Sequence, residues 1–459
     1  MNWYRVGIKS TTRIQIEKIE GVEVSVMSDA DGDRGQREVT VPKGLFDISK
    51  LSIVKAYGSR LVADTGAEYL DFASGIASLP VGHSHPEVIK AITAQAQDYL
   101  HLCFNLTAYQ PYLSLAERLN NLAPGHGPKK TMLLNSGAEA VENAVKIARY
   151  VQKREGLIAF QHSFHGRTSL AAGLTGRVRA IKAGFGLPHP GIFHAPYAYC
   201  YRCSFGLAYP NCDINCLTGL HDLVRYTIPA KQVAALIMEP ILGEGGAVVP
   251  PMEFVQGVEK FCRDKGIILI MDEIQTGLGR TGAWFASQHF GVAPDLVLTA
   301  KALGGGLPLS GVTGRAEIMD AVYPGGLGTT FGGNPVCCRA GLAVIEIIEQ
   351  ENLIARAAEV GRKLKQGLDR LQEMFPIIGD VRGLGAMMGI ELVEDPASKT
   401  PAVEAAKKLF EICLRRGLLL VSGGTYRNVL RLLPPLIVTD DELDQALGTL
   451  KAALTEVVG

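Results

Sequence analysis

The sequence carries no excess charge of either sign. Its 46 lysine and arginine residues equal its 46 aspartate and glutamate residues, and its isoelectric point is about 7.1. Proteins that bind nucleic acid or anionic membranes usually have a basic surface. The chain also lacks an apolar run long enough to span a bilayer, and its first segment, MNWYRVGIKS, is too short and too polar for a signal peptide. We therefore expect a soluble protein with no nucleic-acid partner and no membrane partner.

Cysteine is scarce. The 459 residues include nine cysteines, too few to indicate a disulfide framework in a chain of this length. Cys262 and Cys413 lie in apolar runs, where a reduced cysteine packs as a small hydrophobic residue. The expected compartment is therefore the cytoplasm.

Four further cysteines lie close together in the segment YCYRCSFGLAYPNCDINC, namely Cys200, Cys203, Cys212 and Cys216. A C-x-x-C pair followed by two more cysteines could bind zinc or an iron–sulfur cluster. The plainer alternative is four reduced thiols that pack a loop, and the chemistry inferred below requires no metal. The sequence leaves both interpretations open.

The acidic residues near the N-terminus lack the full pattern of a calcium site. Asp29, Asp31 and Asp33 have the spacing of a calcium-binding loop. The glycine that should follow Asp33 is missing, and Thr40 stands where the closing acid should be. We therefore interpret residues 27–44 as a polar loop.

The chain length predicts two or three domains. From about residue 130, short apolar segments alternate with amphipathic helical segments, which indicates an α/β fold with a mostly parallel sheet covered on both faces. The expected strands are KTMLLN, LIAF, AALIMEP, IILIMDE and DLVLTA, and the expected helices include VENAVKIARYVQK and MEFVQGVEKFCRDKG.

After about residue 345, long helical segments mix with short strands, which predicts a smaller α+β domain. The last helix should begin with a capping box formed by Thr439 and Glu442. We expect residues 1–85 to contribute to the small domain, residues 86–345 to form the large domain, and residues 346–459 to form the C-terminal small domain.

Ligands of parallel α/β sheets bind beyond the carboxyl ends of the strands, so the residues after each apolar run are the first candidates for a site. Asp272 directly follows five apolar residues. Most acids at strand ends simply face water. A carboxylate in a strand covered on both faces, however, requires a cation or hydrogen bonds. A protonated ring nitrogen would meet that requirement.

The segment after KTMLLN combines small residues with a helix start. Gly137 and Ala138 would place backbone N–H groups at a helix N-terminus, where an anion binds well. An ordinary helix start explains this stretch equally well. The segment is neither G-x-G-x-x-G nor a Walker loop, which disfavours dinucleotides and nucleoside triphosphates.

The segment FQHSFHGRTSLAAG follows another expected strand. Phe164 could stack on a planar cofactor, and Arg167 could bind a carboxylate through its two-pronged donor set. Surface arginines are common, so this segment alone is weak support for a site.

Lys301 stands between DLVLTA and the small-residue loop GGGLPLSG, with no acid within five residues. Most lysines are surface residues. This one should lie at the same sheet edge as Asp272, and the glycines allow a ligand to approach closely. A partly desolvated lysine has a lowered pKa and becomes an amine nucleophile. A reactive lysine, an acid for a pyridine nitrogen and a helix N-terminus for a phosphate together predict pyridoxal phosphate as cofactor.

Several segments, in a fixed order, are similar to the class III aminotransferases, which are pyridoxal-phosphate enzymes of fold type I. They are NSGAEAVENAVKIAR, FHGRT, EPILGEGG, MDEIQTGLGRTG, TAKALGGGLPLS and GTTFGGNP. The resemblance covers nearly the whole chain, and 4-aminobutyrate aminotransferases are the most similar group. It implies a large domain with a mostly parallel seven-stranded sheet, a smaller α+β domain, and a homodimer or dimer of dimers.

The resemblance also implies roles for individual residues. Lys301 would form the imine with the cofactor and shuttle protons, while Asp272 would pair with the pyridine nitrogen and Gln275 with the ring hydroxyl. Other cofactor contacts would come from Gly137, Ala138, Phe164, His165, Glu239, Ile274 and, from the neighbouring subunit, Thr330. The substrate contacts would be Ile76, Asn105, Arg167, Glu244 and Arg431.

Two arginines in this implied site would allow one pocket to accept two different acids. Arg167 would bind the far carboxylate of an ω-amino acid. Arg431 would pair with Glu244 until a second substrate brings an α-carboxylate, because a buried guanidinium without a partner costs several kcal/mol.

Three functions remain open at this point. The first is transamination of an ω-amino acid such as 4-aminobutyrate or 5-aminovalerate, or of ornithine, with 2-oxoglutarate as acceptor. The second is amino-acid racemisation or epimerisation on the same scaffold. The third is cofactor-free binding without catalysis, which the presence of both Lys301 and Asp272 disfavours.

Overall fold

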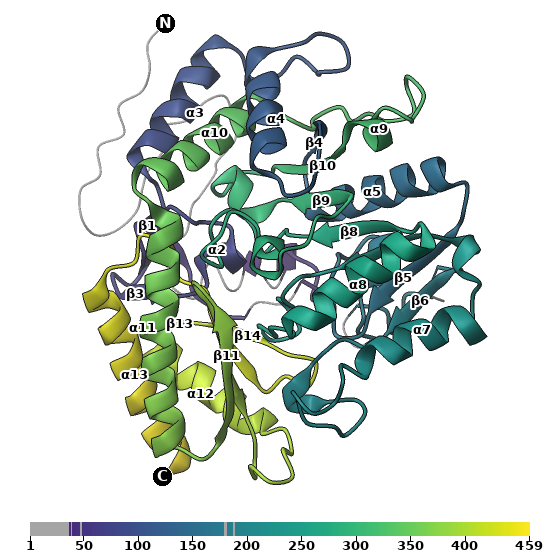
Figure 1. Cartoon of the computed structure of the whole chain (residues 1–459). Coiled ribbons are helices and arrows are strands. Elements are labelled where there is room, and N and C mark those ends of the chain that lie inside the picture. The colour runs from purple at the N-terminus through teal and green to yellow at the C-terminus, as the bar shows by residue number, and fades with distance from the viewer. Residues whose placement is uncertain (1–35, 38, 46–47, 179–180, 187–188) are drawn as a thin grey trace, which may run out of the picture.

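The computed structural model describes residues 36–37, 39–45, 48–178, 181–186 and 189–459 (Figure 1). The acidic residues Asp29, Asp31 and Asp33 lie outside this part of the chain. No helix in the described ranges is long and apolar enough to cross a membrane.

A seven-stranded sheet forms the centre of the larger part of the molecule, in the order β4-β10-β9-β8-β7-β5-β6. β10 runs antiparallel to both of its neighbours, and the other neighbouring strands of this sheet pair in parallel. The predicted α/β fold with a mostly parallel seven-stranded sheet is therefore confirmed. The strand bounds are β4 (Lys129–Leu134), β5 (Gly156–Phe160), β6 (Ile192–Ala195), β7 (Val233–Met238), β8 (Ile268–Asp272), β9 (Leu296–Thr299) and β10 (Ser310–Arg315).

Helices cover both faces of this sheet, as the continuous apolar strands predicted. In β8, Ile268 and Ile270 join the core under α5 (Gly137–Gln152), while Leu269 and Met271 join the opposite core under α8 (Met252–Lys265). This alternation follows from the two-residue period of a strand. α7 (Cys216–Tyr226) lies beside α8 on the same face (Figure 1).

The C-terminal part forms a second layer of helices and short strands at the lower left of Figure 1. Its antiparallel sheet has the order β11-β12-β15-β14. The elements are α11 (Leu353–Met374), β11 (Ile378–Leu384), β12 (Met387–Leu392), α12 (Val403–Arg415), β13 (Leu418–Leu419), β14 (Val421–Gly423), β15 (Val429–Leu432) and α13 (Asp440–Val458). The predicted capping box of α13 is present, because Thr439 Oγ1 accepts from the Glu442 N–H at 3.3 Å and Glu442 Oε2 accepts from the Thr439 N–H at 3.1 Å.

The N-terminal strands are joined to this C-terminal part. β1 (Ile53–Tyr57), β2 (Arg60–Ala63) and β3 (Glu68–Asp71) form a sheet whose fourth strand is β13, parallel to β3. Directly after β3, the Leu433 N–H donates to the Phe72 carbonyl at 2.7 Å, and Ser74 Oγ donates to the Leu433 carbonyl at 2.6 Å. Residues far apart in sequence therefore form one unit here, while the exact domain boundaries stay a prediction.

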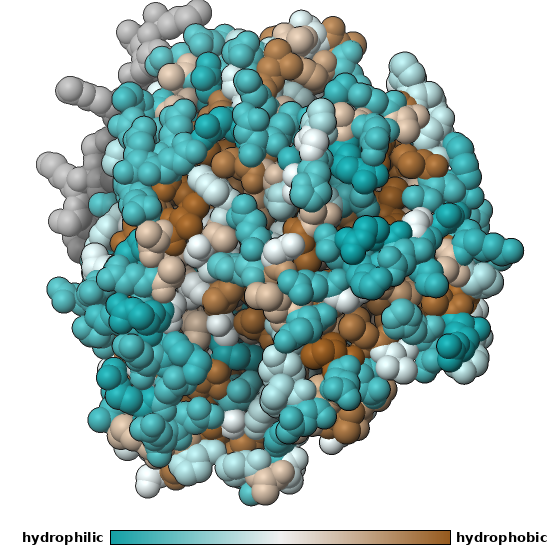
Figure 2. Space-filling view, in the orientation of Figure 1, coloured by the Kyte–Doolittle hydropathy of each residue, from teal (hydrophilic) through white to brown (hydrophobic). Residues whose placement is uncertain are grey.

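The remaining helices complete the larger part of the molecule. α3, α4 and α10 lie together at the top of Figure 1. Hydrophilic residues cover much of the visible face and break up its apolar patches (Figure 2). The bounds are α2 (Ser74–Ala77), α3 (Pro86–Asp98), α4 (Gln110–Leu122), α6 (Ser169–Leu174), α9 (Ala316–Met319) and α10 (Pro335–Gln350).

Candidate active site

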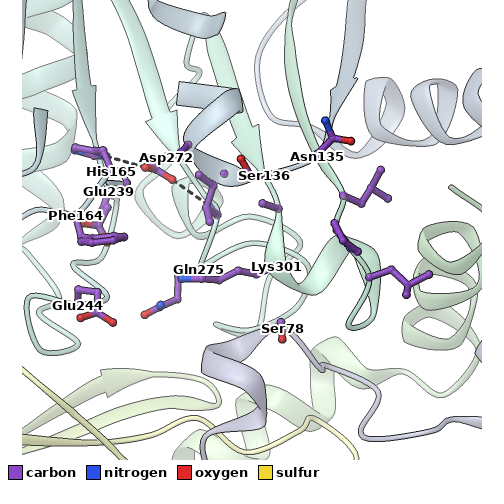
Figure 3. Close-up of a pocket in the computed structure, with 18 of the residues that line it drawn as sticks. Ser78, Asn135, Ser136, Phe164, His165, Glu239, Glu244, Asp272, Gln275 and Lys301 are labelled. Atoms are coloured by element: carbon purple, nitrogen blue, oxygen red, sulfur yellow. Dashed lines mark hydrogen bonds and ion pairs between the residues drawn. The ribbon is translucent and has the colours of Figure 1, made fainter. Parts of the chain in front are cut away.

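A cavity of about 380 Å³ lies at the carboxyl ends of the parallel strands (Figure 3). Its walls come from the residues after β4, β5, β7, β8 and β9, together with Ser78 and the loop 306–309. This is the edge where a parallel α/β sheet binds its ligands. The structure brings the predicted residues Gly137, Ala138, Phe164, His165, Glu239, Glu244, Asp272, Ile274, Gln275 and Lys301 together around this one space.

Asp272 ends β8 as a buried carboxylate, with 3% of its surface exposed. Its Oδ2 lies 2.7 Å from Nδ1 of His165, and its Oδ1 accepts from the Ile274 N–H at 3.2 Å. Within the described residues, Nε2 of His165 is buried without a hydrogen-bond partner. The carboxylate is thus fixed in orientation by two donors and faces the cavity (Figure 3).

Lys301 begins the 3₁₀ helix η4 (Lys301–Gly304) and extends into the same cavity. Its φ of 45° is in the left-handed region, a strained conformation for a residue with a side chain, and such strain concentrates at functional sites. Burial lowers the pKa of the Lys301 amine and Arg431 acts in the same direction, while Glu244 opposes both. The amine is therefore a stronger candidate for a neutral base or nucleophile than an exposed lysine would be.

The N-terminus of α5 forms another wall. Ser136 and Glu139 make a capping box, in which Ser136 Oγ accepts from the Glu139 N–H at 3.2 Å. The N–H groups of Gly137 and Ala138 belong to the first turn and have no partner within the helix. A Cβ at position 137 would lie 2.9 Å from Cδ1 of Ile274, so glycine allows the Ile274 side chain to pack against the helix start. The wall offers backbone donors to an anion.

Glu239 is a buried acid at the end of β7. Its two oxygens accept from the N–H groups of Phe164 and Gly243, each at 2.8 Å. Burial raises the pKa of Glu239 to about 7, despite the opposing effect of His165. Through its hydrogen bond to the Phe164 N–H, Glu239 holds the loop that carries Phe164 against the end of β7.

Glu244 and Arg431 form an ion pair at the cavity wall, with 2.7 Å between Oε1 and Nη2. Arg431 on β15 is fully buried and also donates to Gln275 Oε1 at 3.1 Å. Burial works against ionisation of Glu244, but Arg431, Arg177 and Lys301 together lower its pKa to about 2. Glu244 and Gln275 line the cavity, and Arg431 lies one layer behind them.

Besides Arg431, four predicted residues do not line this cavity. Ile76 is 39% exposed on α2. Asn105 and Thr330 are both exposed, and Asn105 Nδ2 lies 3.0 Å from where a Cβ on Gly328, two residues before Thr330, would be. Arg167 is exposed beside the cavity, with Cζ 5.6 Å from the centre of the Phe164 ring. Their roles stay predictions.

The sequence reasoning did not single out Ser78 and Ser136, which line the cavity, or Arg177, which contacts the cavity residue Glu244. Ser136 could have been found, because its spacing to Glu139 is that of a capping box. Arg177 follows α6 in an irregular segment and gives no such signal. Its Nη2 lies 3.3 Å from Glu244 Oε2, and its Nη1 donates to the Glu244 carbonyl at 3.4 Å.

The four cysteines of the loop 200–216 lie around a separate cavity of about 20 Å³. Burial and the neighbouring thiols raise the pKa of Cys216 to about 12 and also raise the pKa of Cys200. Among the residues that the structure describes, no group of three or more histidine, cysteine, aspartate or glutamate side chains is arranged to hold a metal ion. The geometry therefore adds no support for the zinc or iron–sulfur interpretation.

A lysine, a buried carboxylate and a helix N-terminus line this one cavity, as expected of a pyridoxal-phosphate enzyme, and the sequence as a whole supports that class. Residues 45–454 match the family model described as aminotransferase class-III. The chain belongs to the class III aminotransferases, which confirms the resemblance and shows that the protein is an enzyme.

The chain is similar to several individual aminotransferases of this family over most of its length. The chain is 44% identical to the 4-aminobutyrate aminotransferase GabT of Escherichia coli, over 92% of this chain and 97% of that protein. It is also 44% identical to the 5-aminovalerate aminotransferase DavT of Pseudomonas aeruginosa, with the same coverage. A probable 4-aminobutyrate aminotransferase of Bacillus subtilis is 43% identical over 91% of this chain and 96% of that protein.

Solved structures agree on the fold. An (S)-enantioselective ω-transaminase from Thermomicrobium roseum superimposes with a TM-score of 0.88 at 31% identity, covering 95% of this chain and all of that one. An aminotransferase from Bacillus anthracis gives 0.86 at 31% identity, covering 94% of this chain and all of that one.

Proposed function

We propose that the protein transfers the amino group of an ω-amino acid, such as 4-aminobutyrate or 5-aminovalerate, to 2-oxoglutarate with pyridoxal 5'-phosphate as cofactor. The observation that carries the substrate class is the Glu244–Arg431 pair at 2.7 Å on the cavity wall. A pocket that binds a diacid as its second substrate requires a cation for the additional carboxylate. That cation must be paired with an acid while the first substrate, which lacks this carboxylate, is bound. Relatives named for 4-aminobutyrate and 5-aminovalerate support the same class.

The cavity fits this cofactor. Its volume of about 380 Å³ lies in the range of ligand pockets, roughly 300–1,000 Å³. Asp272 would hold the ring nitrogen, the first turn of α5 would hold the phosphate, and Phe164 and Ile274 would cover the two ring faces. Gln275 would contact the ring hydroxyl. When bound, the cofactor supplies the electron sink and carries the amino group between the two substrates.

The chain's own groups supply binding and proton transfer. The amine of Lys301, with its pKa lowered by burial, takes a proton from the substrate carbon and returns it during transfer. The carboxylate of Asp272 would stabilise the positive charge on the ring nitrogen of the cofactor. His165 fixes the orientation of that carboxylate, since its Nδ1 lies 2.7 Å from Asp272 Oδ2.

Arg167 would bind the far carboxylate of the amino donor from the rim of the cavity. Arg431 would bind the α-carboxylate of the second substrate once Glu244 has moved away. Ile76 and Asn105 would line the substrate pocket, and Thr330 would reach the phosphate from the neighbouring subunit of a homodimer.

The test is a panel of donors (4-aminobutyrate, 5-aminovalerate, ornithine and a simple amine) with 2-oxoglutarate and with pyruvate, measuring the amino acid formed from each acceptor. We expect glutamate formation with the two ω-amino acids. In addition, Arg167→Ala should raise KM for the ω-amino acids much more than for the simple amine. Conversion of a single L-amino acid to its D-isomer without any keto acid, and no glutamate formation, would replace this proposal with racemisation.

A further inference from the structure

The carboxylate of Glu244 is shared between two arginines. Arg431 Nη2 holds Oε1 at 2.7 Å, and Arg177 Nη2 holds Oε2 at 3.3 Å. One carboxylate cannot neutralise two guanidinium groups, so this wall keeps a net positive charge even when Glu244 and Arg431 are paired. The two contacts also differ in length, and the one to Arg177 is the looser.

Arg177 has unused donor capacity on this side of the cavity. Its Nε is buried and has no hydrogen-bond partner in the described part of the chain, and its Nη1 makes only a 3.4 Å contact with the backbone carbonyl of Glu244. A guanidinium binds a carboxylate best through two parallel N–H groups, one of which can be Nε. The observed single contact therefore leaves room for a stronger, two-pronged one.

We propose that Arg177 is the second binding position of Glu244, which receives the carboxylate when Arg431 turns to the α-carboxylate of the acceptor substrate. This rests on the proposed function, in which Arg431 must be released from Glu244. Without Arg177, release would leave a partly buried carboxylate without a charged partner, which is unfavourable. With Arg177, Glu244 exchanges one guanidinium for another, and the exchange reverses when the acceptor leaves. Arg177 is in this sense a positioning residue that sets specificity for diacids.

The inference predicts that loss of Arg177 affects the binding of some ligands and not of others. Removing the charge of Arg177 leaves the pair of Glu244 and Arg431 intact but makes its opening more costly. Ligands that need Arg431 should bind more weakly, and ligands that need only the outer carboxylate site should be unaffected. Loss of one charged hydrogen-bonding partner corresponds to a change of about tenfold or more in affinity.

The experiment compares the holoenzyme with its Arg177→Gln and Arg177→Lys variants. The dissociation constants of glutarate, a diacid without an amino or keto group, and of valerate, its monoacid counterpart, are measured by calorimetry. KM values for 2-oxoglutarate and for the amino donor are measured alongside. Arg263→Gln, which removes an exposed arginine of α8, serves as the matched control.

We expect Arg177→Gln to weaken glutarate binding and raise KM for 2-oxoglutarate by about tenfold, with valerate binding and the donor KM changed less than about twofold. Arg177→Lys should recover part of the loss, and Arg263→Gln should change nothing. In a Glu244→Ala background, Arg177→Gln should have no further effect on glutarate.

Three results would overturn the inference. Equal weakening of glutarate and valerate would make Arg177 a general electrostatic or outer-carboxylate contact. Unchanged glutarate binding would remove it from the exchange. A persistent effect in the Glu244→Ala background would mean that Arg177 contacts the ligand directly. A wild-type enzyme that does not transfer amino groups to 2-oxoglutarate would instead refute the proposed function, whatever the variants bind.

Discussion

The active-site cavity and the four-cysteine cavity both gather titratable side chains in partly buried surroundings, but with opposite results. In the candidate active site, burial raises the pKa of Glu239 to about 7 and lowers the pKa of Lys301, while Arg431 and Arg177 outweigh burial and lower the pKa of Glu244 to about 2. In the cysteine cavity, burial and like groups act in the same direction and raise the pKa of Cys216 to about 12. Only the first arrangement provides an acid and a base at one pH.

The largest effect on the active-site side of this comparison is expected for a substitution of Lys301. Lys301→Ala removes the amine that we propose as the proton carrier, and we expect turnover to fall by at least about 10²–10⁴-fold, the usual contribution of a general base. Steady-state kinetics against Lys265→Ala, at the exposed end of α8, isolates the effect. Retained turnover in the Lys301 variant would show that this amine is not the base.

The second largest effect is expected for Asp272→Asn. The amide keeps the size of the side chain but cannot balance a positive charge on a ring nitrogen, so we expect kcat to drop by about 10²–10³-fold. The change should appear in kcat at saturating substrate, with the folded protein verified by circular dichroism. A kcat within tenfold of wild type would leave Asp272 with an orienting role for His165 alone.

Glu239 gives a test by stability and pH. Its pKa is raised from 4.5 to about 7 in the folded protein, so its contribution is fully present below about pH 4.5 and is lost as the pH rises through 7. Relative to Glu239→Gln, the free energy of unfolding of wild type should therefore decline by about 3 kcal/mol at most between pH 4.5 and 7.5, at about 1.4 kcal/mol per pKa unit. Urea denaturation of both proteins at the two pH values measures the difference. A constant difference would mean that folding does not raise the pKa of Glu239.

The smallest effect is expected at the cysteine cavity. Cys203→Ser and Cys216→Ser should leave turnover within about twofold of wild type, because the thiols do not line the active-site cavity. Their melting temperatures should fall by only a few degrees, as expected for about 1 kcal/mol. The metal content of the purified wild type and of both variants is measured as well. Stoichiometric zinc or iron in the wild type, lost in both variants, would show that this loop binds a metal.

The sequence predicted those parts of the fold that local pattern determines. Five strands of the large sheet were readable as apolar runs. β10, with the sequence SGVTGR, was not, because two glycines and alternating small residues give no strand signal and its position depends on pairing with β4 and β9. Residues directly after strands, such as Asp272 and Lys301, were predictable for the same reason. The contact of Arg177 with Glu244 joins residues 67 positions apart in sequence, and no local pattern specifies it.

The bonds that tie Phe72 and Ser74 to Leu433 have a mechanical consequence. Leu433 directly follows β15, which carries Arg431, and Ser74 is four residues from Ser78 on the cavity wall. The wall segment that ends at Ser78 and the strand behind the wall that carries Arg431 are therefore bonded to each other although they are far apart in sequence, while Lys301 and Asp272 belong to the separate large sheet. Because β15 and the segment 72–74 are hydrogen-bonded to each other, a shift of the strand that carries Arg431 would be transmitted toward Ser78.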